Sequence, residues 1–172
     1  YILRPPADSK PTVVTPVPVP DSSGNKIVIA ETQLAEALKG AGSSTTRTKV
    51  RIRKDGTTAN TSLSQLASLA SKAFSGYDRN PHAVAVFVAT MLQESAWLAT
   101  TVEYGDGVKS YDPYRGRTFE QVTHKANYAV MSQWCFDKGL VPTNDYFVKN
   151  PEVLGDLAYS WIGGIWYFEY RK

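Results

Sequence analysis

The chain has 172 residues, which is enough for one domain with a single buried core. Its 19 basic and 16 acidic residues give a net charge of +3, a bias too weak to favour nucleic acid as a partner. No run of 18 apolar residues occurs, so we expect no membrane span in this chain. The lone Cys135 excludes an internal disulfide and a cysteine metal site, and we expect it to be a small buried hydrophobe. We expect no cofactor.

Residues 1–26 differ in composition from the rest of the chain. Prolines recur there among Val, Thr and Ser, which predicts an extended linker or a docking arm. The valines could instead lie along a partner as an edge strand. The chain opens on Tyr1 without a visible signal peptide, which suggests a piece of a longer polypeptide. We therefore expect residues 1–26 to connect a globular domain, residues 27–172, to the rest of that polypeptide or to a larger assembly.

The first half of the domain predicts two helices and a hairpin. Thr32–Lys39 has the pattern of a short amphipathic helix, stopped by Gly40. Arg47–Lys54 alternates basic and apolar residues with period two, and Asp55-Gly56 is a hairpin-turn signal. The basic face of this hairpin could contact an anionic polymer, but we favour a solvated face. Ser62–Phe74 then repeats apolar residues at helical spacing.

The most apolar helix is predicted over Pro81–Ala99, with Asn80 as its cap. Glu94 lies near its end, on the same side as Met91 and Phe87. Apolar neighbours and a helix C-terminus would both disfavour the ionised form of its carboxyl. A carboxyl that stays protonated near neutral pH is what a general acid requires. The alternative is an ordinary Glu on a solvated last turn.

The second half predicts a loop and two further helices. Residues 105–116 are rich in Gly, Asp, Tyr and Pro and should form the loop. Thr118–Gln133 is predicted as a helix, and Asn150–Pro151 opens a last, strongly apolar helix that runs to Trp166. We therefore expect a mainly α fold with a small β-hairpin.

Several segments resemble family 19 glycoside hydrolases, in the order seen in that family. They are Ile27–Leu38, Gln93-Glu94-Ser95, Gly116–Tyr128 and Asn150–Leu154. The family carries a His-Glu-Ser/Thr motif on a helix, then a Gly-Arg-Gly-x-x-Gln-Leu-Thr/Ser-x-x-x-Asn-Tyr segment, then Asn-Pro-Glu-Leu-Leu. The resemblance is to the chitinase-like lysozymes that phages and bacteria direct at peptidoglycan. The resemblance covers about residues 27–172 and implies a lysozyme-like catalytic domain.

The resemblance also implies roles for two carboxylates. Glu94 would be the general acid and Glu103, nine residues downstream, the general base. Inverting glycoside hydrolysis needs an acid on one side of the scissile bond and a base that holds water on the other. The substrate implied is the β-1,4-linked glycan of peptidoglycan, with chitin as the alternative.

Polar and aromatic residues of the matched segments would bind the sugar. Gln121 and Thr123 match the pair that orients the attacking water or binds sugar. Asn127 matches an Asn that bonds a sugar substituent, while Tyr128 would support it by packing. The motif's Arg, Arg117, is a structural ion-pair partner or a sugar contact. Aromatic residues that could stack on sugar rings or pack in the interior are Trp97, Tyr104, Tyr111 and Tyr114.

The chain also departs from the family pattern. Gln93 replaces the family's His, and Ala96-Trp97 replaces a Gly-Gly pair after the acid. Thr118 replaces the second Gly of Gly-Arg-Gly, so we do not expect that turn to adopt a positive φ. The chain ends at Lys172, short of the family's C-terminal helices, so the domain is either incomplete or trimmed.

Two other hypotheses compete with hydrolysis. Met91–Trp97 also resembles the Gln-Glu-Ser-x-Phe signature of goose-type lysozymes and lytic transglycosylases, in which Glu94 would act alone. We favour hydrolysis because Gln121–Tyr128 matches family 19, whereas the transglycosylases' Gly-Leu-Met-Gln segment is absent. A non-catalytic structural or glycan-binding module on the same fold is the third hypothesis. The expected setting is a phage tail or baseplate acting outside the cytoplasm, with a released endolysin or a secreted protein as alternatives.

Overall fold

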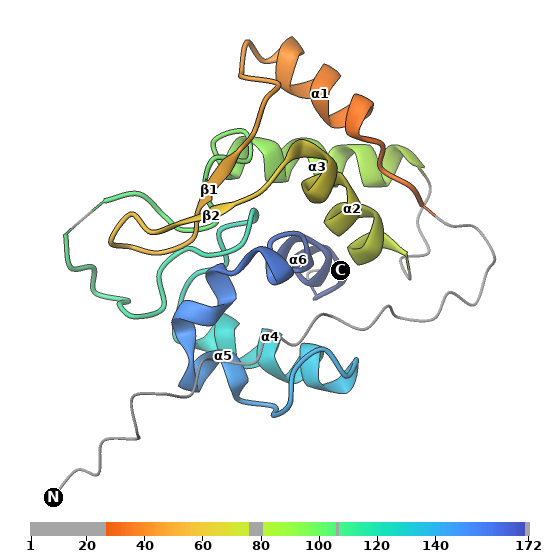
Figure 1. The fold of residues 1–172 in the computed structure, drawn as a ribbon. Helices are drawn as coiled ribbons and strands as arrows, with labels where there is room; N and C mark the ends of the chain where they lie inside the picture. The colour runs from red at the N-terminus through yellow and green to blue at the C-terminus, as the bar shows by residue number, and fades with distance from the viewer. Residues whose placement is uncertain (1–26, 76–80, 106, 171–172) are drawn as a thin grey trace, which may run out of the picture.

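The computed structural model describes residues 27–75, 81–105 and 107–170 (Figure 1). The fold is mainly helical with one small antiparallel sheet, as predicted. Its elements, in chain order, are α1 (Glu31–Gly40), β1 (Lys49–Arg51), β2 (Thr58–Asn60), α2 (Leu63–Phe74), α3 (Pro81–Glu94), α4 (Lys125–Asp137), α5 (Tyr146–Lys149), the 3₁₀ turns η1 (Pro151–Gly155) and η2 (Leu157–Tyr159), and α6 (Ile162–Tyr170). None of the helices in the described ranges has the length and apolarity needed to cross a membrane. The predicted arm, residues 1–26, and the predicted cap Asn80 lie outside the described residues.

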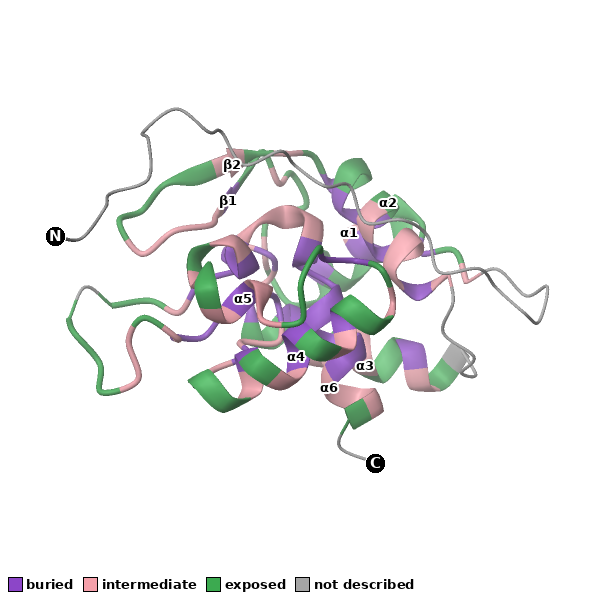
Figure 2. Ribbon diagram, turned by 90° about the horizontal axis from the view of Figure 1, so that it is seen from below, coloured by how far each residue is buried: buried purple, intermediate pink, exposed green. Residues whose placement is uncertain are grey.

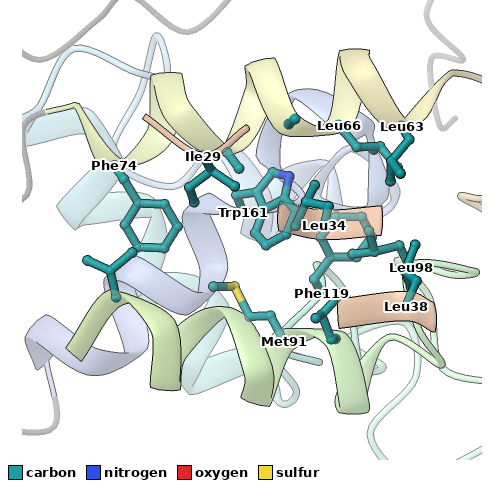
Figure 3. Close-up of a cluster of buried hydrophobic side chains, with 14 of the residues drawn as sticks. Ile29, Leu34, Leu38, Leu63, Leu66, Phe74, Met91, Leu98, Phe119 and Trp161 are labelled. Carbon is teal, nitrogen blue, oxygen red and sulfur yellow. The ribbon is translucent and has the colours of Figure 1, made fainter. Parts of the chain in front are cut away.

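Two hydrophobic clusters form the core, and α6 contributes to both. The first cluster joins α1, α2 and α3 to Ile165 of α6 (Figure 3). The side chains of this cluster that are labelled in Figure 3 are Ile29, Leu34, Leu38, Leu63, Leu66, Phe74, Met91, Leu98, Phe119 and Trp161. The second cluster joins α4 and α5 to Trp166 of α6. Figure 2 shows the buried residues concentrated around α6 and on the inner faces of the surrounding helices. The short helix α6 therefore ties the two halves of the molecule together.

The helices α1 and α2 agree with the predicted segments to within one residue at each end. The amphipathic periodicity is realised, because Leu34 and Leu38 of α1 are both buried. At the start of α2, the Ser62 side chain accepts a hydrogen bond from the backbone N–H of Gln65 at 3.1 Å. This is the cap that a Ser before an apolar run predicts.

The predicted hairpin is present; on its basic face Lys49 is exposed, whereas Arg51 and Arg53 are half-buried. Val50 pairs with Ala59 and is fully buried. Arg51 donates to the carbonyls of Arg53 and Lys54, and Arg53 pairs with Asp156 at 2.6 Å. The Arg51 guanidinium thus bonds within the turn of the hairpin, whereas the Arg53 guanidinium attaches the hairpin to the rest of the domain.

The helix α3 ends at Glu94, so the prediction of helix to Ala99 is wrong over its last five residues. Ala96, Trp97 and Leu98 all adopt positive φ, at 49°, 60° and 64°. Each such residue costs roughly 1–2 kcal/mol because its Cβ approaches the following carbonyl. The Ser95 side chain accepts a bond from the N–H of Leu98 at 2.9 Å and helps hold the turn. The chain thus reverses sharply just after Glu94.

The prediction of helix over Thr118–Gln133 is wrong for its first seven residues, because α4 begins at Lys125. Arg117 instead forms isolated antiparallel bridges to Val102 and to Val122. Thr118 has a φ of 68°, which contradicts the expectation that this turn avoids positive φ. Its fully buried side chain fits only because residue 163 is glycine: a Cβ there would overlap Thr118.

The last predicted helix is broken into η1, η2 and α6. The break falls at Gly155, which is buried where a Cβ would lie 2.6 Å from the backbone oxygen of Ile52. The following residue, Asp156, is extended with φ and ψ of −68° and 147°. Close approach of the hairpin to Gly155 thus interrupts a sequence that is otherwise helical. Asp156, at this break, forms the ion pair with Arg53.

Candidate functional site

A cleft of about 490 Å³ lies between the end of α3 and the segments that follow it. Six of the residues proposed from the sequence for catalysis or binding line it together: Glu94, Glu103, Tyr104, Tyr111, Gln121 and Thr123. The remaining lining residues are Gln93, Ala96, Thr100 and Gly116. These residues come from four separate stretches of chain, so only the folded backbone brings them together.

Short β-bridges hold three of these stretches side by side. Val102 pairs with Arg117, and Arg117 pairs with Val122. The N–H of Glu103 then donates to the carbonyl of Gly116 at 2.9 Å. This bridging fixes Glu103 opposite the turn that carries Gln121. The backbone, more than the side chains, therefore sets the width of the cleft on this side.

Glu103 is half-buried and held by two donors. The Tyr111 hydroxyl donates to Oε1 at 2.8 Å, and the Gly116 N–H donates to Oε2 at 3.3 Å. The same contact raises the pKa of Tyr111, first through the hydrogen bond to Glu103. Glu103 is therefore arranged as an oriented acceptor, which is the property that a general base needs.

Glu94 is placed differently. It is the last residue of α3 and is exposed. Within the described part of the chain, no hydrogen bond or ion pair holds its carboxylate. The apolar stripe that was expected to desolvate it instead turns inward, where the fully buried Met91 packs against Gly164. The expectation that apolar neighbours desolvate Glu94 is therefore wrong.

A third carboxyl, Glu120, was missed by the sequence analysis. Burial, and secondly the negative charge of Glu94, raise the pKa of Glu120 to about 7. Its Oε2 atom is buried without a hydrogen-bond partner. Glu120 lies within a predicted helix and at a variable position of the family motif, so no sequence signal distinguishes it. Its environment is created entirely by the fold.

Gln121, Thr123 and Asn127 form a chain of hydrogen bonds beside the cleft. The Gln121 amide donates to the carbonyl of Thr118 at 3.1 Å, and the Thr123 hydroxyl donates to the carbonyl of Gln121 at 2.7 Å. Asn127 donates its amide to the carbonyl of Thr123 at 2.8 Å and does not line the cleft. Asn127 therefore stiffens the wall that presents Gln121 and Thr123. A Cβ at Gly116 would lie 2.7 Å from the Gln121 side-chain oxygen, so the wall has no spare room there.

Tyr128 and Arg117 lie beneath this wall. Both side chains are fully buried. The Tyr128 hydroxyl accepts from Arg117 at 2.7 Å and donates to the carbonyl of Arg115 at 2.6 Å. Burial raises the pKa of Tyr128 well above its usual range. Arg117 also pairs with Glu152 and donates to the carbonyl of Pro113, so of its two expected roles the structure has the ion pair.

The aromatic residues divide between the cleft and the interior. Tyr104 is 55% exposed at the cleft, and the guanidinium of Arg51 lies 5.1 Å from its ring centroid. Trp97 is half-buried and packs against the first hydrophobic cluster. Tyr114 packs edge-on against Tyr128, 5.3 Å between ring centroids. Tyr104 is thus an accessible platform, whereas Trp97 and Tyr114 contribute to packing.

Two aspartates of the loop after Glu103, and Cys135, remain to be placed. Asp112 accepts from the N–H of Lys109 and pairs with Arg115 at 2.9 Å. This pairing lowers the pKa of Asp112 below its usual range, through the hydrogen bond from Arg115 first. Asp106 lies outside the described residues. Cys135 is buried, as predicted.

Comparisons with known proteins add no assignment. No model of a protein family matches the chain, and no solved structure is significantly similar to it. Among the residues that the structure describes, no group of three or more His, Cys, Asp or Glu side chains is arranged to hold a metal ion. The cleft and its carboxyl groups are therefore the basis for any functional argument.

Proposed function

We propose that this chain is a lysozyme-like glycoside hydrolase, which cleaves β-1,4 bonds of peptidoglycan by an inverting mechanism with two carboxylates. One observation carries the proposal: Glu94 and Glu103 line the same cleft in contrasting environments. Glu103 is oriented by Tyr111 and Gly116 as an acceptor, while Glu94 is exposed at the end of α3. Catalysis of this kind requires one carboxyl that donates a proton and one that accepts a proton.

In the proposed reaction, Glu94 donates its proton to the glycosidic oxygen as the bond from that oxygen to the sugar carbon breaks. Glu103 accepts a proton from a water molecule, whose oxygen bonds to the same carbon from the opposite face. Gln121 and Thr123 lie on the cleft wall, where they can orient the water or a sugar substituent. Tyr104 offers an exposed ring on which a pyranose can stack.

The backbone conformation at three positions where this chain lacks the family's glycine supports the resemblance. Ala96, Trp97 and Thr118 stand where the family has glycine, and all three adopt positive φ. Glycine is the residue that adopts such conformations at least cost. The backbone at these three positions therefore has the conformation that glycine favours, although each residue carries a side chain.

The biological setting is proposed on the resemblance and the composition of residues 1–26. A phage tail or baseplate would carry such a domain to peptidoglycan outside the cytoplasm, with residues 1–26 as its connection to the assembly. A released endolysin or a secreted protein would use the same chemistry. Chitin, which shares the β-1,4 linkage, is the alternative substrate.

The test is lysis of purified peptidoglycan, followed by turbidity and by mass spectrometry of the products. We expect Glu94→Gln and Glu103→Gln each to reduce turnover by roughly 10²–10⁴-fold, the usual contribution of general acid–base catalysis. The control is Glu36→Gln, which removes one negative charge from the exposed side of α1 and should retain full activity. Each variant must first match the parent in circular dichroism and thermal unfolding.

Other outcomes would replace the proposal with a competing hypothesis. Activity that survives Glu103→Gln, with anhydro-muropeptides among the products, indicates a lytic transglycosylase that uses Glu94 alone. Binding to peptidoglycan without lysis by the parent chain indicates a glycan-binding module. Lysis of chitin oligomers but not of peptidoglycan changes the substrate and keeps the mechanism.

A further inference from the structure

Two cations stand on the face of β1 that points away from the core. Lys49 and Arg51 alternate with Val50, which is fully buried, so their side chains leave the strand on the opposite side. Lys49 is exposed, and Arg51 is half-buried. Both positive charges therefore reach the surface of the domain.

The strand β1 runs directly beside the cleft. Arg51 forms a parallel bridge to the lining residue Thr100, with backbone hydrogen bonds of 2.9 Å on either side of that bridge. The guanidinium carbon of Arg51 lies 5.1 Å from the ring centroid of Tyr104, the exposed aromatic residue of the cleft. The carbonyls of Arg53 and Lys54 accept from this guanidinium and hold it there. A fixed positive charge thus adjoins the ring that we propose as a sugar platform.

This positive charge has no acidic partner. Neither Lys49 nor Arg51 takes part in an ion pair within the described residues. Asp55, the acid of the hairpin turn, uses its Oδ1 atom for two hydrogen bonds within the turn, at 2.9 and 2.7 Å. The Nε and Nη2 atoms of Arg51 donate to backbone carbonyls, whereas Nη1 makes no hydrogen bond to the described residues. Arg51 therefore keeps both a charge and donors for a ligand at Tyr104.

We propose that Arg51, with Lys49 two residues along the strand, binds a carboxylate of a peptidoglycan stem peptide and so selects peptidoglycan over chitin. This inference rests on the proposed glycoside hydrolase function. The two polymers share the β-1,4 linkage, but chitin is uncharged, whereas the stem peptides of peptidoglycan carry free carboxylates. A guanidinium binds a carboxylate through charge-assisted hydrogen bonds. Charge complementarity therefore favours the anionic polymer.

The cleft alone would disfavour an anionic ligand. Glu94 and Glu103 both line it, and a negative substituent close to two carboxylates is repelled. Arg51 places a positive charge against Tyr104, at the side of the cleft formed by residues 100–104. A stem peptide that leaves the stacked sugar on that side meets this cation. The arrangement thus offsets the repulsion for a charged stem and gives nothing to a neutral glycan.

The test compares one glycan with and without its charge. Glycan strands that retain their stem peptides are prepared from sacculi free of teichoic acid, and the stem carboxylates of half the material are converted to amides. All proteins carry Glu94→Gln so that strands are not cleaved, and binding is measured by isothermal titration calorimetry. For the chain with no further change, we expect amidation to weaken binding roughly tenfold, as for loss of a hydrogen bond between charged groups. Equal affinity for native and amidated strands overturns the proposal.

Substitutions locate the site. Arg51→Gln should weaken binding of native strands roughly tenfold and of amidated strands little, because the charge that it pairs with is gone. Lys49→Gln should show the same pattern with a loss of about threefold, as for an exposed ion pair. The control is Lys39→Gln at the end of α1, which removes an equal charge outside the hairpin and should change either affinity less than about twofold. A loss in Arg51→Gln that is equal for both ligands overturns the proposal, since Arg51 would then only support Tyr104.

Binding and lysis separate this inference from the hydrolase proposal. If the parent chain lyses no glycan but its binding depends on stem carboxylates and on Arg51, the hydrolase proposal fails and the carboxylate site stands. If the parent cleaves chitin oligomers as well as it cleaves peptidoglycan strands, the hydrolase stands and the selectivity fails. Because amidation alters the ligand and not the protein, the comparison remains decisive if Arg51→Gln does not fold.

Discussion

The two walls of the cleft are built in different ways. On the loop side, Glu103 is fixed by direct hydrogen bonds from Tyr111 and Gly116. On the helix side, Glu94 is exposed, and order is imposed on the backbone around it: the left-handed turn over residues 96–98. The wall on the loop side thus orients the Glu103 side chain. The wall at the end of α3, here called the helix wall, fixes the backbone of residues 96–98 and leaves the Glu94 carboxyl accessible.

This contrast matches the different needs of the two proposed roles. A base must hold one water molecule in line with the sugar carbon, so its orientation matters most. An acid must reach the leaving oxygen and be reprotonated once per turnover, so access to solvent and a retained proton matter most. The comparison leads to four predictions, which begin with the largest expected effect.

The largest difference should appear with a substrate that needs no acid. A 2,4-dinitrophenyl glycoside of an N-acetylglucosamine oligomer has a leaving group that departs without a proton. We expect Glu94→Gln to recover most of its roughly 10²–10⁴-fold loss on this substrate, while Glu103→Gln stays inactive because water must still be activated. Release of the phenolate is measured by absorbance. Equal loss in both variants on this substrate would contradict the division of roles.

The next largest effect concerns the support of the wall that carries Glu120 and Gln121. A Cβ at Gly163 would overlap the buried Thr118 side chain, so Gly163→Ala must displace that turn. We expect it to lower the free energy of unfolding by about 1–3 kcal/mol, the usual range for overpacking. Thermal and denaturant unfolding measure this. The control is Gly40→Ala at the end of α1, where a Cβ meets nothing within 4 Å and stability should not fall.

The elements set by local signals were predictable from the sequence. Periodicity and the Ser62 cap predict α1 and α2, and the Asp55-Gly56 turn predicts the hairpin. The candidate carboxylates Glu94 and Glu103 were proposed from motifs, and the structure brings them to one cleft. Each of these features depends on residues that lie close together in the chain.

The remaining features depend on contacts that no local pattern reveals. The turn at residues 96–98 is held in part by Arg47, which donates to the carbonyl of Trp97 from 50 residues away. Thr118 can adopt positive φ because residue 163 is glycine. Glu120 acquires its raised pKa from burial and from Glu94, on a different element. Sequence periodicity therefore predicted continuous helices in three places where the structure has turns: after Glu94, before Lys125 and at Gly155.

A smaller effect is expected from Tyr111→Phe, which removes one of the two donors to Glu103. The ring remains, so the change tests orientation alone. Loss of a hydrogen bond to a charged group is worth about 1.5 kcal/mol or somewhat more, so we expect kcat/KM to fall roughly tenfold. The control is Tyr114→Phe, whose hydroxyl donates to the carbonyl of Val148 at 3.3 Å and does not line the cleft. If both variants lose activity equally, Glu103 does not depend on the Tyr111 hydroxyl.

The smallest effect tests the backbone of the helix wall, through Ala96→Gly. Ala96 is exposed and has a φ of 49°, so glycine relieves roughly 1–2 kcal/mol of steric cost without loss of packing. Greater freedom of glycine in the unfolded chain offsets about 0.5–1 kcal/mol of this gain. We therefore expect a net stabilisation of about 0.5 kcal/mol, measured by denaturant unfolding. The opposite sign is expected for Ala37→Gly on the exposed side of α1, where the same change in a regular helix costs about 1 kcal/mol. Equal destabilisation of both variants would show that the backbone of Ala96 is not strained. Tertiary contacts would then not be forcing the turn that follows Glu94.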